Sequence, residues 1–294
     1  MKRPIAVSAV VPALLAVLFA APGRAQLGGI LNRAKSKIDK ARDQAKPATD
    51  RAQRAVDTYQ PWSAEEEQQI GEAAAAKMIA IFGLVEDPAQ VRYVNLVGQV
   101  VAAFAPRQLS YRFAILDTDI VGAFALPGGF VFVTRAALEH MNSEAELAGA
   151  LGHEIVHVSE RHLEKEIRSK ATTNWAAEEA RSRAGSLLKD RADAVVKDLF
   201  GTKLSRDKED HADREGASMA GGAGYDPGAL AQFLQKLATA GSKEESKRAF
   251  GQLLSTHPPF EERIAQLGSI SGAGKGATLE ARYHAAVAAT AAKP

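Results

Sequence analysis

The chain has 294 residues, 46% of them hydrophobic and 24% charged, which is the balance of a globular protein with room for one or two domains. The formal net charge is only +2 and no dense basic patch follows the first quarter of the chain, so no nucleic-acid partner is expected. The chain contains no cysteine, which excludes disulfides, thiolate zinc sites and a lipid-modified N-terminal cysteine. Any bound metal must therefore be held by His, Asp or Glu.

Residues 1–25 have the pattern of a secretory signal peptide. A basic start is followed by the uncharged stretch 5–21, and Gly23 and Ala25 are small residues at the two positions that a signal peptidase reads. This pattern predicts cleavage near Ala25 and a periplasmic or secreted protein. An uncleaved N-terminal membrane anchor is the alternative, although the stretch is short for a bilayer and contains Pro12.

Residues 26–60 are rich in Ala, Lys, Arg, Asp and Gln. Their helically spaced apolar positions are mostly alanine, which buries too little area for this segment to fold by itself. We therefore expect a solvated, partly helical tether. The alternative is that residues 27–60 associate weakly with an anionic membrane surface or with a partner.

A compact domain is expected over residues 61–268, followed by a flexible Gly/Ala-rich tail at 269–294. Capping patterns and helical periodicity predict helices at 63–81, 87–104, 143–158, 174–200, 205–222, 228–239, 244–254 and 260–268. Alternating apolar residues predict strands at 111–116 and 130–133. The predicted fold class is α+β, mostly helical, with a small mixed or antiparallel sheet.

His153, Glu154 and His157 are the only ionisable residues between positions 147 and 158. Two histidines four residues apart project from one helix face, where both imidazoles can reach one zinc ion. Glu154 is offset by about 100° around the helix, which is poor for a ligand but suits a general base acting on a water at the metal. A hydrogen-bonded histidine pair in a surface groove is the alternative.

A catalytic zinc site needs a third protein ligand. The acidic stretch 205–213 supplies candidates, because Glu209 and Asp213 share one helix face and His211 lies between them. One carboxylate could bind zinc while the other accepts the second N–H of a ligating imidazole. A solvated surface helix is the competing interpretation, and geometry alone leaves all three residues eligible.

Five segments carry a resemblance to the zinc metallopeptidase family that includes HtpX, BepA and the Ste-type CAAX prenyl proteases. In chain order they are Ala125–Val133, Glu144–His157, Ser205–Gly216, Ala223–Pro227 and Thr256–Arg263. The resemblance spans about Trp62 to Leu267, and five pieces in the right order make it specific. It implies a zincin-like domain whose sheet presents an edge strand to the active-site cleft, and a metalloendopeptidase that binds one Zn2+ per chain.

The resemblance also implies residue roles. Glu209 becomes the third zinc ligand and Asp213 the residue that orients a ligating imidazole, while His211 departs from the acidic residue common at its position. His257 and Arg263 are implied to approach the cleft and act in catalysis, where they would stabilise the oxyanion. His257 could instead occupy the open zinc position, and a turn residue before two prolines is its structural alternative.

Gly128, Gly129, Phe130 and Val131 are predicted to hold an extended peptide substrate by strand addition, with plain sheet structure as the alternative. His140, His162 and His284 are predicted to be ordinary surface residues. The expected function is hydrolysis of unfolded or misassembled exported polypeptides in protein quality control. The alternatives are a chaperone-like binding protein with a self-blocked zinc site, and a structural protein with an incidental motif.

Overall fold

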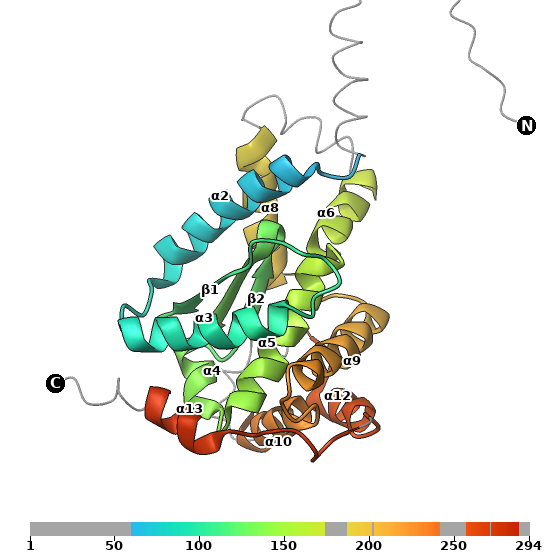
Figure 1. Ribbon diagram of the computed structural model, residues 1–294. Helices are drawn as coiled ribbons and strands as arrows, with labels where there is room; N and C mark the ends of the chain where they lie inside the picture. The colour runs from blue at the N-terminus through green and yellow to red at the C-terminus, as the bar shows by residue number, and fades with distance from the viewer. Residues whose placement is uncertain (1–59, 174–186, 202, 242–256, 271, 288–294) are drawn as a thin grey trace, which may run out of the picture. The chain divides into compact units, whose positions relative to one another are not determined.

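A small mixed sheet with helices packed around it forms the described part of the chain in the computed structural model (Figure 1). The structure describes residues 60–173, 187–201, 203–241, 257–270 and 272–287. The expected signal peptide, nearly all of the expected tether and the expected helix at 244–254 lie outside these residues. Among the described helices, none combines the length and apolar composition needed to cross a membrane.

The predicted α+β class is confirmed. The helices are α2 Ala64–Phe82, α3 Pro88–Ala102, α4 Arg135–His140, α5 Glu144–Ser159, α6 His162–Thr173, α8 Leu187–Gly201, α9 Arg206–Gly222, α10 Ala229–Gly241, α12 Phe260–Leu267 and α13 Glu280–Val287. The strands are β1 Arg112–Leu116, β2 Ala123–Leu126 and β3 Phe130–Thr134, with the short 3₁₀ turn η1 Pro127–Gly129 between the last two.

The sheet order is β1-β3-β2, with β1 parallel and β2 antiparallel to β3. The expectation that residues 130–133 present the free edge is therefore wrong. These residues lie in the central strand, whose backbone is hydrogen-bonded on both sides and cannot accept an added strand. The edge strand beside the site is β2, while Leu84 bridges to Leu116 on the opposite edge.

Side-chain caps explain where several helices begin. Ser63 and Glu66 form the predicted reciprocal capping box at the start of α2. Ser143 caps α5 by accepting the N–H of Glu146, but the Glu146 carboxylate accepts the N–H of Asn142 instead of closing the second half of the box. The motif helix α5 therefore begins where the sequence predicts, with only half of the expected motif.

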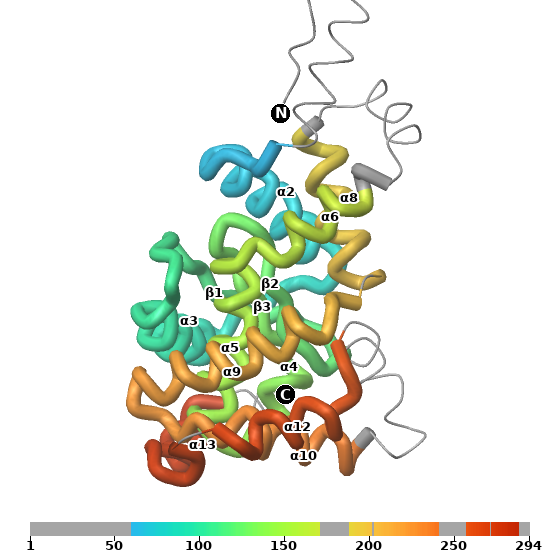
Figure 2. The backbone as a smooth tube through the Cα atoms, turned by 90° about the vertical axis from the view of Figure 1, so that its right-hand side faces the viewer, coloured from blue at the N-terminus to red at the C-terminus, as the bar shows by residue number. Residues whose placement is uncertain are grey.

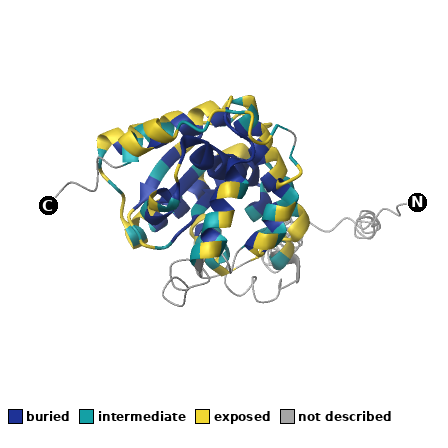
Figure 3. Ribbon diagram, turned by 90° about the horizontal axis from the view of Figure 1, so that it is seen from below, coloured by how far each residue is buried: buried dark blue, intermediate teal, exposed yellow. Residues whose placement is uncertain are grey.

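Helix α5 runs through the centre of the domain, where the buried residues gather (Figure 3). Helix α9 lies beside it, and α10 and α12 pack nearby (Figure 2). The two long helices cross at glycines, because a Cβ on Gly152 would lie 2.6 Å from the Gly216 oxygen. Only glycine at both positions allows this approach, which brings the side chains of α9 onto the face of α5 that carries the motif.

The expectation of a loose tail is wrong for residues 272–287. Helix α13 packs on the domain, where the Tyr283 side chain is buried and donates to the Leu138 carbonyl at 2.5 Å. Arg282 pairs with the buried Glu144, which also accepts from Tyr93 and Tyr225. The Tyr283 hydroxyl and the Arg282 guanidinium thus fix this segment, although its composition is that of a linker.

Candidate metal centre

Helix α5 presents His153 and His157 on one face, as predicted. Both side chains are buried, and their Nε2 atoms lie 2.9 Å apart. Two ring nitrogens at this separation converge on a single point next to the helix. The neighbouring turns are apolar and fully buried at Leu151 and Ile155, so the motif is held by core packing rather than by a surface loop.

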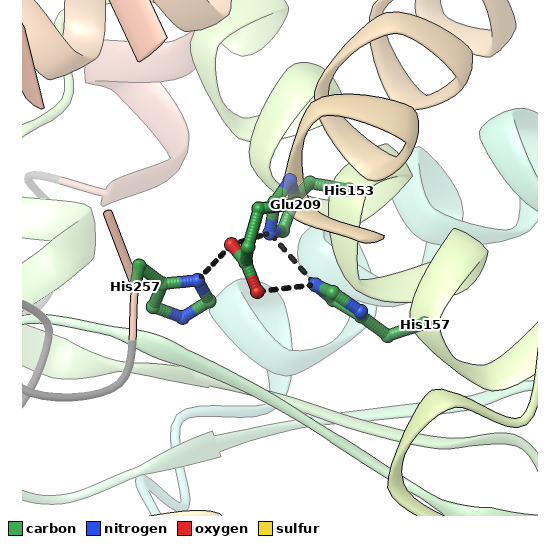
Figure 4. Close-up of side chains that lie close together, drawn as sticks. All are labelled: His153, His157, Glu209 and His257. Atoms are coloured by element: carbon green, nitrogen blue, oxygen red, sulfur yellow. Dashed lines mark hydrogen bonds and ion pairs between the residues drawn. The ribbon is translucent and has the colours of Figure 1, made fainter. Parts of the chain in front are cut away.

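Glu209, the fourth residue of α9, reaches the same point from that helix (Figure 4). Its Oε2 lies 3.7 Å from His153 Nε2, and its Oε1 lies 3.7 Å from His157 Nε2. The side chain is fully buried. Candidate ligand atoms of His153, His157, Glu209 and His257 all lie within 4.8 Å of one another.

The donor set fits zinc. Two imidazole nitrogens and a carboxylate are a common ligand set of catalytic zinc. Glu209 Oε1 is a buried oxygen that accepts no hydrogen bond, although buried polar atoms are nearly always satisfied. A cation between this oxygen and the two Nε2 atoms would satisfy it. Among the candidates on α9, His211 is only half-buried and does not belong to the cluster.

His153, the first candidate metal ligand, is oriented by a carboxylate. His153 Nδ1 lies 2.8 Å from Asp213 Oδ1, so an N–H there donates to Asp213 and leaves Nε2 free for the metal. Arg263 donates to both oxygens of Asp213, at 2.6 and 2.9 Å. All three side chains are buried. The guanidinium of Arg263 is thus engaged with Asp213, which supports a positioning role for it.

His157, the second candidate metal ligand, has a different partner, which the sequence did not reveal. His157 Nδ1 lies 2.8 Å from Nδ1 of His162, and the His162 side chain is buried. The expectation that His162 is an ordinary surface residue is wrong. Residues five apart do not face each other on a continuous helix. The two rings meet because the helix is interrupted between His157 and His162. His284 is exposed as expected, and His140 Nδ1 lies 2.8 Å from the Ala136 carbonyl.

Glu154 lies in the cleft beside the cluster. It lines two adjoining hollows, one on the His157 side and one on the His153 side, together with Ala123 of β2 and His257. The hollow on the His157 side also touches Leu199 of α8 and Leu126 of β2. The edge strand, the predicted general base and the predicted metal ligands therefore share one cleft.

His257 joins the cluster from the segment before α12. Its Nδ1 lies 2.6 Å from Glu209 Oε2, and its ring centroid lies 5.4 Å from that of His153. It is the most exposed member of the four-residue group. The predicted approach of His257 and Arg263 to the cleft is thus seen for both side chains, with His257 nearer the ligand atoms.

The residues predicted to hold substrate are engaged elsewhere. Gly128 has a φ of 77° and donates its N–H to Glu67 of α2 at 3.3 Å. Gly129 also has positive φ, and both glycines are buried in the turn. Phe130 and Val131 pair with β1 and β2. These four residues lie in the turn and in the central strand, so they do not form the free edge of the sheet.

The pKa values of the buried carboxyl groups are shifted in different directions. Burial raises the pKa of Glu154, as suits a group that accepts and returns protons near neutrality. Burial alone would raise the pKa of Glu209, but His257 outweighs it and the net pKa lies well below the ordinary value. The pKa of Asp213 is likewise held low by Arg263 against burial.

The pKa values of two buried histidines are lowered. Burial, helped by the neighbouring His153, holds the pKa of His157 well below its usual value. Burial, followed by Lys208 and Lys165, lowers the pKa of His162 to about 4. Both imidazoles are therefore neutral at pH 7, which is the form that binds metal or accepts a hydrogen bond.

The part of the chain that carries this cluster resembles known proteins. The profile of Peptidase family M48 matches residues 88–271. The chain is 31% identical over 218 residues to the beta-barrel assembly-enhancing protease of Yersinia pestis, covering 69% of this chain and 43% of the relative. It is 28% identical over 215 residues to that of Escherichia coli K12, covering 68% and 42%. It is 30% identical over 155 residues to the mitochondrial metalloendopeptidase OMA1 of Arabidopsis thaliana, covering 53% and 30%.

The chain spans about two fifths of the length of the bacterial relatives it matches first. The family match includes the motif helix, the helix of Glu209 and the segment of His257. The family predicted from the five sequence segments is confirmed, and the chain belongs to Peptidase family M48.

Proposed function

We propose that the protein is a zinc-dependent endopeptidase. The observation that carries this proposal is the convergence of His153 and His157 on α5 with the buried, hydrogen-bond-deficient carboxylate of Glu209 on α9, beside Glu154. These three side chains would hold a zinc ion. Zinc bound there would supply Lewis-acid chemistry, which would lower the pKa of a water molecule and polarise a carbonyl.

Glu154 is proposed as the general base. It takes a proton from the attacking water and returns it to the leaving nitrogen, so one carboxylate serves both half-reactions. Its burial and raised pKa support this exchange at neutral pH. His257, with its ring at the cluster and part of its surface in the cleft, is proposed to donate a hydrogen bond to the developing oxyanion. Arg263 is proposed to act indirectly, by holding Asp213 in place.

Strand β2 is proposed to hold the substrate backbone. Thr134 N–H donates to the Gly122 carbonyl at 3.0 Å, which makes this a hydrogen-bonded pair. Because such pairs alternate in an antiparallel ladder, Ala123 and Ala125 direct their N–H and C=O groups away from β3. An extended peptide can add to this edge. Binding of this kind reads backbone, so it favours unfolded segments over compact folds.

A peptide running antiparallel to β2 places its C-terminal half toward Gly122, on the His153 side of the cleft. The hollow there is apolar, lined by Met141, Ala150, Leu230 and Phe233 together with the metal-site residues. We infer that this hollow takes the side chain of the substrate residue after the scissile bond, and that the enzyme prefers an apolar residue there.

The physiological role is proposed as degradation of unfolded or misassembled exported proteins. The signal-peptide pattern of residues 1–25 supports a periplasmic or secreted location. Two bacterial relatives named beta-barrel assembly-enhancing proteases support a role in protein quality control. Weak association of residues 27–60 with a membrane surface is proposed from their composition.

The test compares the wild type with Glu154→Gln, using casein as an unfolded substrate and zinc content as a second readout. The proposal expects one zinc per chain in both proteins and loss of casein hydrolysis by a factor of 10³ or more in the variant. Glu160→Gln, at the end of the same helix, is the matched control and should cleave like the wild type. Casein hydrolysis by Glu154→Gln at the wild-type rate would overturn the assignment.

A second candidate function rests on the contact between His257 and Glu209. If His257 takes the position left open for water, the protein binds unfolded chains and seldom cleaves them. His257→Ala separates the two. It lowers casein hydrolysis if His257 stabilises the oxyanion, and raises it severalfold if His257 blocks the site.

A further inference from the structure

An interrupted helix brings His162 behind the metal ligand His157. Helix α5 ends at Ser159, and α6 begins at His162. Between them Arg161 has a φ of 52°, in the left-handed region that non-glycine residues seldom adopt. The helix is broken at this residue, and the two Nδ1 atoms lie 2.8 Å apart. A continuous helix would carry His162 to a different face.

The contact fixes the protonation of both rings. If His157 directs Nε2 toward a metal ion, its proton must lie on Nδ1, and that N–H can donate only to an acceptor. His162 Nδ1 is the atom in place, so His162 must be neutral with its own proton on Nε2. His153 is treated differently, because its Nδ1 meets the carboxylate of Asp213. The two ligand histidines thus have partners of different charge.

The left-handed residue is held by several contacts of its side chain. The Arg161 guanidinium donates to the Trp62 carbonyl at 3.0 Å and pairs with Glu67 at 2.8 Å. Glu164, on the first turn of α6, accepts the Trp62 N–H at 2.8 Å. A left-handed backbone conformation is unfavourable for a non-glycine residue, and these contacts offset that cost. The start of the domain therefore braces the turn that places His162.

We propose that His162 is a positioning residue for the zinc ligand His157, and that Arg161 holds it in place by clamping the α5–α6 turn to Trp62 and Glu67. The imidazole of His162 takes the role that the Asp213 carboxylate has for His153: it orients the ring and selects the tautomer whose Nε2 faces the metal. The inference rests on the proposed function only in assuming that zinc binds at His153, His157 and Glu209.

The first test measures zinc affinity by competition with a chelator, independently of activity. His162→Phe keeps a planar ring but removes the acceptor, and should weaken zinc binding about 10- to 100-fold. His162→Gln returns an acceptor oxygen and should recover part of that loss. His284→Phe, at an exposed position of α13, is the matched control and should bind like the wild type. Zinc affinity of folded His162→Phe within twofold of the wild type would overturn the proposal.

The second test separates the backbone turn from the clamp. Arg161→Gly removes the guanidinium but adopts positive φ freely, whereas Arg161→Ala removes the guanidinium and keeps the backbone cost. Both should weaken zinc binding, Arg161→Ala the more. Equal, wild-type affinity in both would remove the clamp from the proposal.

Nitrogen NMR of the wild-type zinc protein gives a readout that needs no variant. It should find His157 protonated on Nδ1 and His162 protonated on Nε2 alone, and a proton on His162 Nδ1 would contradict the inference. If the wild type binds no zinc, the proposed function fails. If it binds zinc and His162→Phe binds equally well, only the positioning role fails.

Discussion

Gly152 on α5 and Gly216 on α9 lie in direct backbone contact. A Cβ on Gly216 would lie 2.5 Å from the backbone nitrogen of His153, and a Cβ on Gly152 would lie 2.6 Å from the Gly216 oxygen. No flexible side chain can move aside to relieve either clash. The distance between the helix of the two histidines and the helix of Glu209 is therefore set by the absence of two methyl groups.

Gly216→Ala is expected to force α9 away from α5. Overpacking of this kind costs about 1 to 3 kcal/mol of unfolding free energy, and the displaced Glu209 should also weaken zinc binding. Urea unfolding and chelator competition measure the two effects. Gly201→Ala is the matched control, since a Cβ there meets nothing within 4 Å. Equal stability and equal zinc affinity in the two variants would contradict the account.

Arg263→Met is expected to destabilise the domain strongly. The substitution leaves the fully buried Asp213 without its bidentate partner, and breaking a buried ion pair typically costs about 3 to 5 kcal/mol. The exposed pair of Arg206 with Glu262 provides the control, because Arg206→Met should cost less than about 1 kcal/mol. Chemical denaturation compares them, and similar losses would show that Asp213 does not depend on Arg263.

The metal-free protein is expected to lose stability as the pH falls below about 6.5. The folded pKa of His162 is about 4, below the ordinary value, so protons bind the unfolded chain more tightly. Its contribution is complete above the unfolded pKa and is lost between about pH 6.5 and 4, at most about 3 kcal/mol. His157 adds a loss of the same sign. Denaturation at pH 7, 5.5 and 4.5 measures the slope.

His162→Phe is the control for the pH series, because it lacks the titrating ring of His162. Its stability should fall less steeply than that of the wild type over the same range. A steeper fall in the variant, or no pH dependence in either protein, would show that His162 is not neutral and buried in the folded chain.

Ala150→Leu is expected to fill the apolar hollow on the His153 side of the cleft. Cleavage before Leu or Phe should drop about tenfold or more, while cleavage before Ala or Gly persists. Phe233→Ala should enlarge the hollow and admit Trp. Mass spectrometry of a cleaved peptide library reads both.

Leu204→Ala, on the His157 side of the cleft, is the control for the Ala150 series. It should leave the preference for the substrate residue after the scissile bond unchanged. If Ala150→Leu instead changes the preference for the substrate residue before the scissile bond, the peptide runs parallel to β2.

Local signals predicted the parts of the site that depend on one helix. His153, Glu154 and His157 share a face because of helical spacing alone, and Glu209 and Asp213 share one for the same reason. The helix starts at Ser63 and Ser143 follow from short-range hydrogen bonds. The family resemblance was needed to predict which acidic residue faces the histidines, because spacing within α9 carries no information about how α9 packs on α5.

The parts that could not be predicted depend on contacts between distant segments. The position of His162 depends on a left-handed arginine, and Arg161 carries no local signal for that conformation. Strand β3 is central because β1 pairs with it in parallel on the side opposite its hairpin partner β2. Alternation within residues 130–133 could not reveal this arrangement. The packing of α13 depends on Glu144, more than a hundred residues earlier.

Anomalous X-ray diffraction at the zinc edge, from crystals of the wild-type protein, locates any bound zinc ion. We expect one zinc peak, about 2.0 to 2.2 Å from His153 Nε2, His157 Nε2 and a Glu209 carboxylate oxygen. A zinc peak bound by other residues, or fully zinc-loaded protein with Glu209 outside bonding distance, would contradict it.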